Sequence, residues 1–212
     1  GLTSLLKFLR NHSPIHFAIS AITFGILPMV KIYAGASLLA GLFIVSIYQL
    51  IKLRSNSLFL ISCASLVIAV LIFLPSNRSA SQILVIEPLW FPRTMMQFAD
   101  RVGWSKFAQA RFTYTQTKNY LKWIPAEVAA VTIFIVGNLG TRILAIPIVA
   151  QISGFRGRQV SPESLTQVLM VTIALISLLP TLLFVQRGNP WNIIQFFYYT
   201  FIAHSFYFIS LP

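Results

Sequence analysis

The sequence predicts an all-α fold, a polytopic transmembrane helix bundle of about five to six spans with one interfacial helical loop. Hydrophobic types make up 57% of the 212 residues and charged types only 9%, whereas about a quarter of a soluble domain is charged. So little charge cannot cover a water-exposed surface of this size, and lipid must cover much of it. The 16 basic residues far outnumber the 4 acidic ones and lie mostly between apolar runs. This placement favours membrane lipids with anionic headgroups as partners and argues against nucleic acid.

The first predicted element is a short amphipathic helix, from Leu2 to Arg10. Its leucines share one helical face, while Lys7 and Arg10 lie elsewhere. Such a helix is typical of the membrane interface. The leucines of this face are Leu2, Leu5, Leu6 and Leu9.

The next apolar stretch, Ile15 to Ile51, is too long for one span. As a single helix it would measure about 55 Å, against about 30 Å for the hydrocarbon core. We therefore expect two helices, with the junction at Pro28, Lys31 and Gly35. The following stretch, Ser57 to Pro75, contains no charge at all, and it gives the strongest prediction of a transmembrane helix in the chain.

Residues 76–125 are predicted to form an amphipathic segment at the membrane interface. They combine seven cations with three tryptophans, and the segment is too long for a structureless link. We expect helices within 95–120, with aromatic rings at the headgroup level and cations facing phosphates.

Three further apolar stretches complete the predicted bundle. Residues 126–152 are apolar apart from Glu127, Asn138 and Arg142, and residues 165–185 form a span that is kinked or broken at Pro180. The final span covers residues 191–210 and is rich in aromatic side chains. We expect 1–212 to be one transmembrane domain and an excerpt of a longer protein, with the rest of that chain or other membrane subunits as partners.

Asn138 and Arg142 form the first candidate site. A charge inside an apolar stretch is costly unless a partner or a water-filled cavity is near, and a guanidinium group binds phosphate through two parallel N–H donors. Arg142 is therefore a candidate ligand of a lipid phosphate or an anionic substrate. The alternative is an arginine at a helix end whose side chain reaches the headgroups.

The second candidate site lies on the last span. Asn192, Gln195 and Tyr199 are spaced i, i+3, i+7 and would share one face of an α-helix. We expect this face to point towards other helices, where polar groups find hydrogen bonds. Binding of substrate and simple helix–helix packing both remain open for these residues.

The cations of residues 76–125 form the third candidate site. Arg93 and Arg101 are the members that we assign to substrate or lipid-phosphate binding, with ordinary headgroup-facing charge as the alternative. The sequence shows no paired carboxylates, no glycine-rich phosphate loop and no Cys/His cluster. It therefore predicts no cofactor and no metal site, and it assigns no catalytic residue.

The segments GNLGTRI, at 137–143, and GNPWNIIQFFYYT, at 188–200, resemble the later membrane helices of bacterial multi-span proteins that look like C-type integral-membrane glycosyltransferases. The resemblance covers about residues 126–212. It implies a location in the bacterial inner (plasma) membrane, a polyprenyl-phosphate-linked sugar as donor, and a catalytic acid in an early loop. No Asp-rich element of that kind is present, so this chain would hold the scaffold and part of the lipid site.

The sequence thus favours the membrane-embedded part of a glycosyltransferase-like protein. Two alternatives stay open: a transporter or flippase of a lipid or an anionic solute, and a non-catalytic membrane scaffold subunit. Prolines that interrupt helices and an intramembrane arginine fit a transporter as well.

Overall fold

The computed structural model describes residues 1–76, 84–140 and 161–200, and these form two compact units. The first unit contains residues 1–76, 161–178 and 195–200. The second contains residues 84–140 and 179–194.

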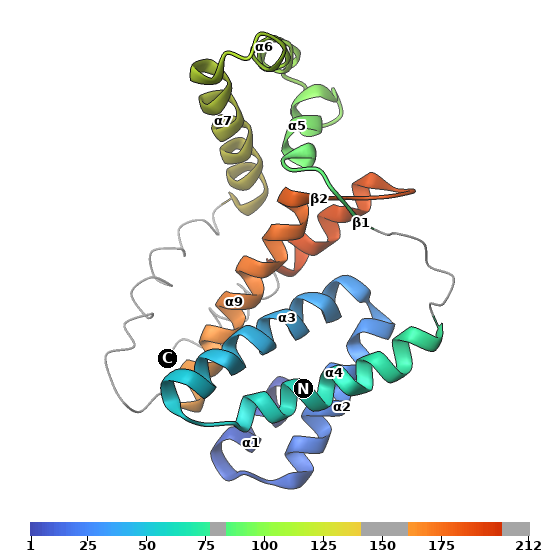
Figure 1. The fold of residues 1–212 in the computed structure, drawn as a ribbon, viewed down its shortest axis with the longest axis vertical. Coiled ribbons are helices and arrows are strands. Elements are labelled where there is room, and N and C mark those ends of the chain that lie inside the picture. The colour runs from blue at the N-terminus through green and yellow to red at the C-terminus, as the bar shows by residue number, and fades with distance from the viewer. Residues whose placement is uncertain (77–83, 141–160, 201–212) are drawn as a thin grey trace. The chain divides into compact units, whose positions relative to one another are not determined.

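The first unit is entirely helical (Figure 1). It is built from α1 (Leu2–Asn11), α2 (Pro14–Val30), α3 (Ile32–Tyr48), the π-helical turn η1 (Gln49–Leu53), α4 (Ser57–Ser76) and most of α9 (Pro162–Leu183). Its core joins side chains from α1, α2, α3, α4 and α9. The buried members of this core are Leu5, Phe8, Phe24, Leu42, Val45, Leu58, Ile61, Leu165, Leu169, Met170, Ile173 and Ala174.

The predicted junction between two helices is confirmed. Lys31 separates α2 from α3 with an extended backbone, at φ −153° and ψ 103°. The two helices approach closely beyond this residue: a Cβ atom added to Gly35 would lie 2.4 Å from the Cα of Pro28. Glycine is the residue that permits such backbone contact. α2 and α3 therefore form a tight hairpin.

The helix predicted from Leu2 to Arg10 is present, but its apolar face packs on protein. Leu5 and Phe8 are buried in the core of the first unit, and Arg10 forms an ion pair with Glu163 in the first turn of α9. An amphipathic pattern shows that a helix has an apolar face. It cannot show whether lipid or other helices cover that face.

The helix predicted at Ser57 to Pro75 is confirmed as α4. Its first turn is held by the side chain of Gln49, whose Oε1 accepts a hydrogen bond of 3.0 Å from the backbone N–H of Leu58. This bond satisfies one of the N–H groups that a helix start leaves without a partner. Small residues of α2 face α4, and a Cβ atom added to Gly25 would lie 2.6 Å from the Cβ of Ile68. Small residues allow membrane helices to pack this closely.

The second unit adds an element that the all-α prediction did not include. β1 (Leu84–Ile86) pairs antiparallel with β2 (Phe184–Gln186), and Val85 lies opposite Val185. The helices of this unit are α5 (Trp90–Gln97), α6 (Ser105–Gln116), α7 (Tyr120–Leu139) and the 3-10 turn η3 (Pro190–Ile193). The unit also receives the last turn of α9.

The pairing of β1 with β2 also shows that the predicted end of the span at 165–185 was wrong. α9 runs through Pro180 without a break and ends at Leu183, where β2 begins. The carbonyls of Leu182 and Leu183 accept hydrogen bonds from the N–H groups of Leu89 and Glu87, at 2.6 and 3.0 Å. These partners are about a hundred residues away in sequence, so no local pattern predicts where the helix ends.

Helices are confirmed in the segment 76–125, where α5 and α6 lie. The predicted end of this segment at residue 125 does not coincide with the end of a helix. The next long helix, α7, begins at Tyr120 and continues through Pro125. Three described helical stretches are long and apolar enough to cross a membrane: Ile32–Leu53, Tyr120–Leu139 and Pro162–Leu183. Pro14–Val30 and Ser57–Phe73 are shorter apolar helical stretches.

Candidate functional site

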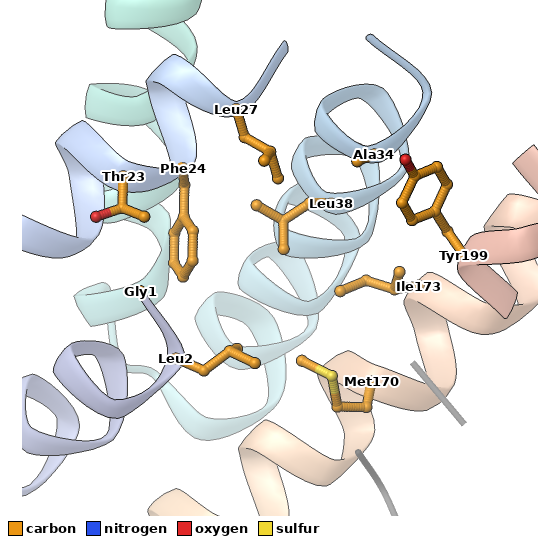
Figure 2. Close-up of a pocket in the computed structure, with 10 residues that line it drawn as sticks. All are labelled: Gly1, Leu2, Thr23, Phe24, Leu27, Ala34, Leu38, Met170, Ile173 and Tyr199. Atoms are coloured by element: carbon orange, nitrogen blue, oxygen red, sulfur yellow. The ribbon is translucent and has the colours of Figure 1, made fainter. Parts of the chain in front are cut away.

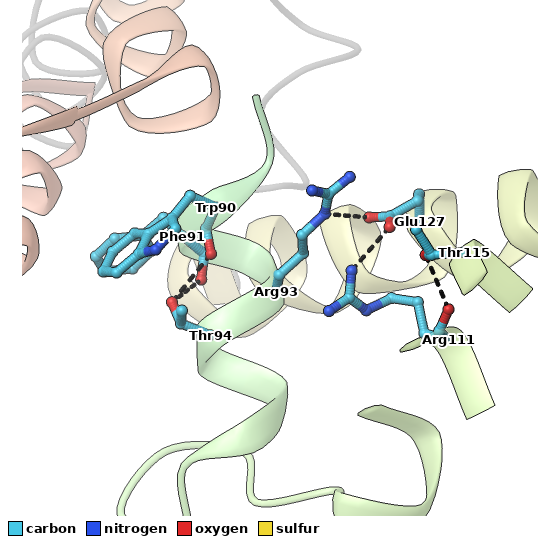
Figure 3. Close-up of polar contacts among 7 residues, drawn as sticks. All are labelled: Trp90, Phe91, Arg93, Thr94, Arg111, Thr115 and Glu127. Atoms are coloured by element: carbon cyan, nitrogen blue, oxygen red, sulfur yellow. Dashed lines mark hydrogen bonds and ion pairs between the residues drawn. The ribbon is translucent and has the colours of Figure 1, made fainter. Parts of the chain in front are cut away.

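A cluster of three charged side chains connects the helices of the second unit (Figure 3). Arg93 comes from α5, Arg111 from α6 and Glu127 from α7. The Nε of Arg93 donates to Oε2 of Glu127 over 3.1 Å, and Nη1 of Arg111 donates to Oε1 over 2.8 Å. Each carboxylate oxygen therefore binds its own arginine. We call these three residues the arginine–glutamate triad.

Small side chains bring the three helices together. Ala108 of α6 and Ala130 of α7 are buried beside Met96 of α5, and the three make a small hydrophobic core. Ala126, Glu127, Ala130 and Phe134 form the buried face of α7. Glu127 thus lies on the side of its helix that faces the other helices of the unit.

The triad is mostly buried and carries more positive than negative charge. The side chain of Glu127 is 6% exposed, that of Arg111 is 7% exposed and that of Arg93 is 32% exposed. Two guanidinium groups share one carboxylate, which leaves one positive charge without an opposite charge in the cluster. Removing a charge from water costs several kcal/mol unless it is paired and hydrogen-bonded. The site therefore favours an additional negative charge.

Both arginines keep hydrogen-bond donors beyond those given to Glu127. The Nε of Arg111 is buried and has no hydrogen-bond partner in the described part of the chain. Figure 3 shows that the hydrogen bond to Glu127 comes from the Nε of Arg93, with no hydrogen bond drawn from either of its terminal nitrogens. Among the described residues, the Arg93 side chain forms no hydrogen bond or ion pair other than the one with Glu127.

Arg101, the other cation assigned from the sequence, has different partners. Its Nε lies 3.5 Å from Oδ2 of Asp100, and its guanidinium lies 5.1 Å from the ring centroid of Trp191. Trp191 follows β2 and packs against the rings of Trp90, Phe91 and Phe98, each at 5.5 Å. Arg101 therefore packs on an aromatic cluster and is not a member of the triad.

The other predicted site residues lie on several different elements. Asn138 donates from Nδ2 to the carbonyl of Phe134 in its own helix, over 2.7 Å. This amide nitrogen therefore has a hydrogen-bond partner within α7. Asn192 lies in the 3-10 turn of the second unit, whereas Gln195 belongs to the first unit. The predicted α-helical face shared by Asn192, Gln195 and Tyr199 is therefore wrong at Asn192. Arg142 lies outside the described residues.

The central residue of the triad was not among the predicted site residues. Glu127 is an acidic side chain within an apolar stretch, and a carboxylate in that position requires a cationic or hydrogen-bonding partner. This signal could have identified Glu127. It could not have chosen Arg93 and Arg111 among the seven cations of residues 76–125, because that choice depends on how three helices pack.

The first unit contains a cavity of about 320 Å³ (Figure 2). Its wall is formed by Leu2 of α1, Phe24 of α2, Leu38 of α3, Ile173 of α9 and Tyr199 of the last helix, among others. The hydroxyl of Thr23, which also lines the cavity, donates to the carbonyl of Ile19 over 2.6 Å. The lining is otherwise apolar apart from the Tyr199 hydroxyl, and such a cavity suits hydrocarbon better than a polar ligand.

A scan against protein-family models and searches of curated proteins and of solved structures found no match to this chain.

Proposed function

We propose that this chain is the membrane-embedded part of a glycosyltransferase that uses a polyprenyl-phosphate-linked sugar. The observation that carries the proposal is the surplus positive charge of the arginine–glutamate triad. It lies in a chain whose described part contains three helices long and apolar enough to cross a membrane. A lipid-linked phosphate combines the two properties that these features match. Its hydrocarbon dissolves in the membrane, and its phosphate suits arginine.

In such a reaction the triad would act on the leaving group. In this reaction an acceptor hydroxyl forms a bond to the anomeric carbon of the sugar and gives its proton to a base outside the triad. The bond from that carbon to the phosphate oxygen breaks, and its electron pair stays on the lipid phosphate. Fixed cationic donors stabilise charge that develops in such a transition state. Arg93 is the residue to which we assign this role, and Arg111 supports it through Glu127. Glu127 already accepts a hydrogen bond on each oxygen, so we assign it to holding the arginines and not to activating the acceptor.

Sugar release tests this proposal. The protein, together with any catalytic segment outside these residues, is purified into lipid nanodiscs and supplied with an acceptor alcohol and a polyprenyl-phosphate sugar labelled in the sugar. We expect labelled sugar to leave the lipid, at a rate that falls at least about tenfold in Arg93→Ala. Lys106→Ala, which removes an exposed cation from the same helix as Arg111, should keep the rate. Absence of release from the wild-type chain would count against the transferase.

A transporter or flippase is the second candidate, and the hairpin of α2 and α3 is the feature that favours it. The chain breaks at Lys31 between two apolar helices, and interrupted helices are common at substrate sites of transporters. α9 no longer supports this reading, because it continues through Pro180. The same labelled lipid in sealed vesicles separates the two functions, because a transporter moves it between leaflets with the sugar still attached. A scaffold subunit neither releases the sugar nor moves the lipid.

A further inference from the structure

We infer that the triad is a phosphate-binding site, in which the outer edge of Arg93 contacts the phosphate while Glu127 and Arg111 position it. The geometry and charge of the triad support phosphate binding by themselves. Only the identity of the molecule that bears the phosphate, a lipid with a phosphate headgroup, rests on the proposed function.

The way Glu127 holds Arg93 makes this arginine suitable for phosphate. The carboxylate accepts from the Nε of the guanidinium, and neither terminal nitrogen is drawn with a hydrogen bond to it (Figure 3). Two parallel N–H donors are the arrangement that binds two phosphate oxygens at once. With 32% of its side chain exposed, Arg93 is the member of the triad that a ligand can reach.

Charge balance points to the same ligand. Two arginines and one glutamate leave one positive charge. A phosphodiester contributes one negative charge and a phosphomonoester about −1.5 to −2 at pH 7, so either one offsets the surplus. An anion beside the cluster would reduce the cost of burying both arginines.

Arg111 acts at a distance from the ligand in this arrangement. Its side chain is 7% exposed and its Nη1 is bound to Glu127, so we assign it as a positioning residue. It fixes one oxygen of Glu127, which leaves the other oxygen to orient Arg93. Loss of Arg111 should therefore weaken phosphate binding less than loss of Arg93.

Phosphate-dependent thermal stability tests the site. The chain is placed in nanodiscs of phosphatidylcholine, and unfolding is followed with inorganic phosphate in the buffer or with farnesyl phosphate, phosphatidylglycerol or farnesol in the disc. A ligand that binds the folded state raises the unfolding temperature in a saturable way. We expect farnesyl phosphate to do so and farnesol not to. An equal effect of inorganic phosphate would identify a free anion as the ligand, and an equal effect of phosphatidylglycerol would identify headgroups in general.

Four variants separate binding from folding. Arg93→Ala should abolish the phosphate-dependent rise, and Arg93→Lys, which keeps the charge but loses the paired donors, should weaken the apparent affinity about tenfold or more. Lys106→Ala should behave as wild type, because Lys106 is exposed on α6. Glu127→Gln should lower stability without phosphate and show a larger phosphate-dependent rise, since it leaves two positive charges uncompensated.

A purely structural triad predicts the opposite pattern. Arg93→Ala would then lower stability, and phosphate would leave every variant unchanged. The site is overturned if the wild-type chain shows no phosphate-dependent stabilisation, or if Arg93→Ala or Arg93→Lys retains all of it. The two proposals fail separately: stabilisation by farnesyl phosphate without sugar release refutes only the transferase. Sugar release without any stabilisation refutes only this site.

Discussion

Arg111 and Glu127 lie on consecutive helices and are joined by a hydrogen bond of 2.8 Å, with 7% and 6% of their side chains exposed. This bond is the buried part of the triad, and Arg93 adds a second arginine from the more exposed side. Whichever member is removed, the charges that remain are still mostly buried. The cost of each substitution should therefore follow the charge balance that it leaves.

Glu127→Leu should be the most destabilising change in the triad. It leaves two neighbouring positive charges without a carboxylate, and breaking a buried ion pair costs about 3–5 kcal/mol. Arg111→Met leaves the balanced pair of Arg93 and Glu127 and should cost about 1–3 kcal/mol. Arg93→Ala leaves the balanced buried pair and should cost least. Denaturant unfolding in detergent micelles measures this order, and equal losses in all three variants would contradict the charge-balance argument.

Gly35→Ala should destabilise the hairpin of α2 and α3, because the added Cβ would lie 2.4 Å from backbone atoms of Pro28. Overpacking of this kind costs about 1–3 kcal/mol. Gly137→Ala is the matched control, since nothing lies within 4 Å of its added Cβ. A glycine in a helix interior is less favourable than alanine by about 1 kcal/mol, so Gly137→Ala should be neutral or stabilising. Thermal unfolding of both variants gives the comparison, and similar effects would argue against the close approach at Gly35.

We expect brominated lipid to quench the fluorescence of Trp104. Half of this residue is exposed beside the start of α6, and its ring stacks on Phe107 at 5.0 Å. An exposed tryptophan among cations is typical of the headgroup region. Bromine on the upper part of the acyl chains should reduce the fluorescence of the wild-type chain more than that of Trp104→Phe. Equal quenching of the two proteins would place Trp104 away from the membrane interface.

Gln195→Lys should disturb the protein more than Gln195→Leu. Gln195 is half-buried and precedes Phe196 and Phe197, which are 7% and 0% exposed. Leucine should fit such surroundings with a modest loss of stability, whereas burial of an ammonium group is far more costly. Folded yield in detergent and unfolding temperature measure the difference. Tyr198→Lys, at a position that is 50% exposed, is the control for the general cost of a lysine in this helix, and an equal loss there would remove the case for an inward-facing Gln195.

Helices were the part of the fold that local sequence could predict. The junction at Lys31 and the helix from Ser57 follow from uninterrupted apolar runs and from the residues that end them. Such patterns depend only on neighbours along the chain. They also showed that the leucines near the N-terminus share a face, but not that Leu5 would be buried in a core that also includes side chains of α2, α3, α4 and α9.

Tertiary structure decided the rest. The pairing of β1 with β2 joins segments about a hundred residues apart, and the triad depends on the packing of three helices around Ala108 and Ala130. The sequence by itself determined that the chain is apolar, cationic and helical, and that Arg93 is one of several cations able to meet a phosphate. Only the fold determined that Glu127 holds Arg93 and Arg111 together. Contacts between distant segments depend on shape and burial, which residue spacing along one helix does not encode.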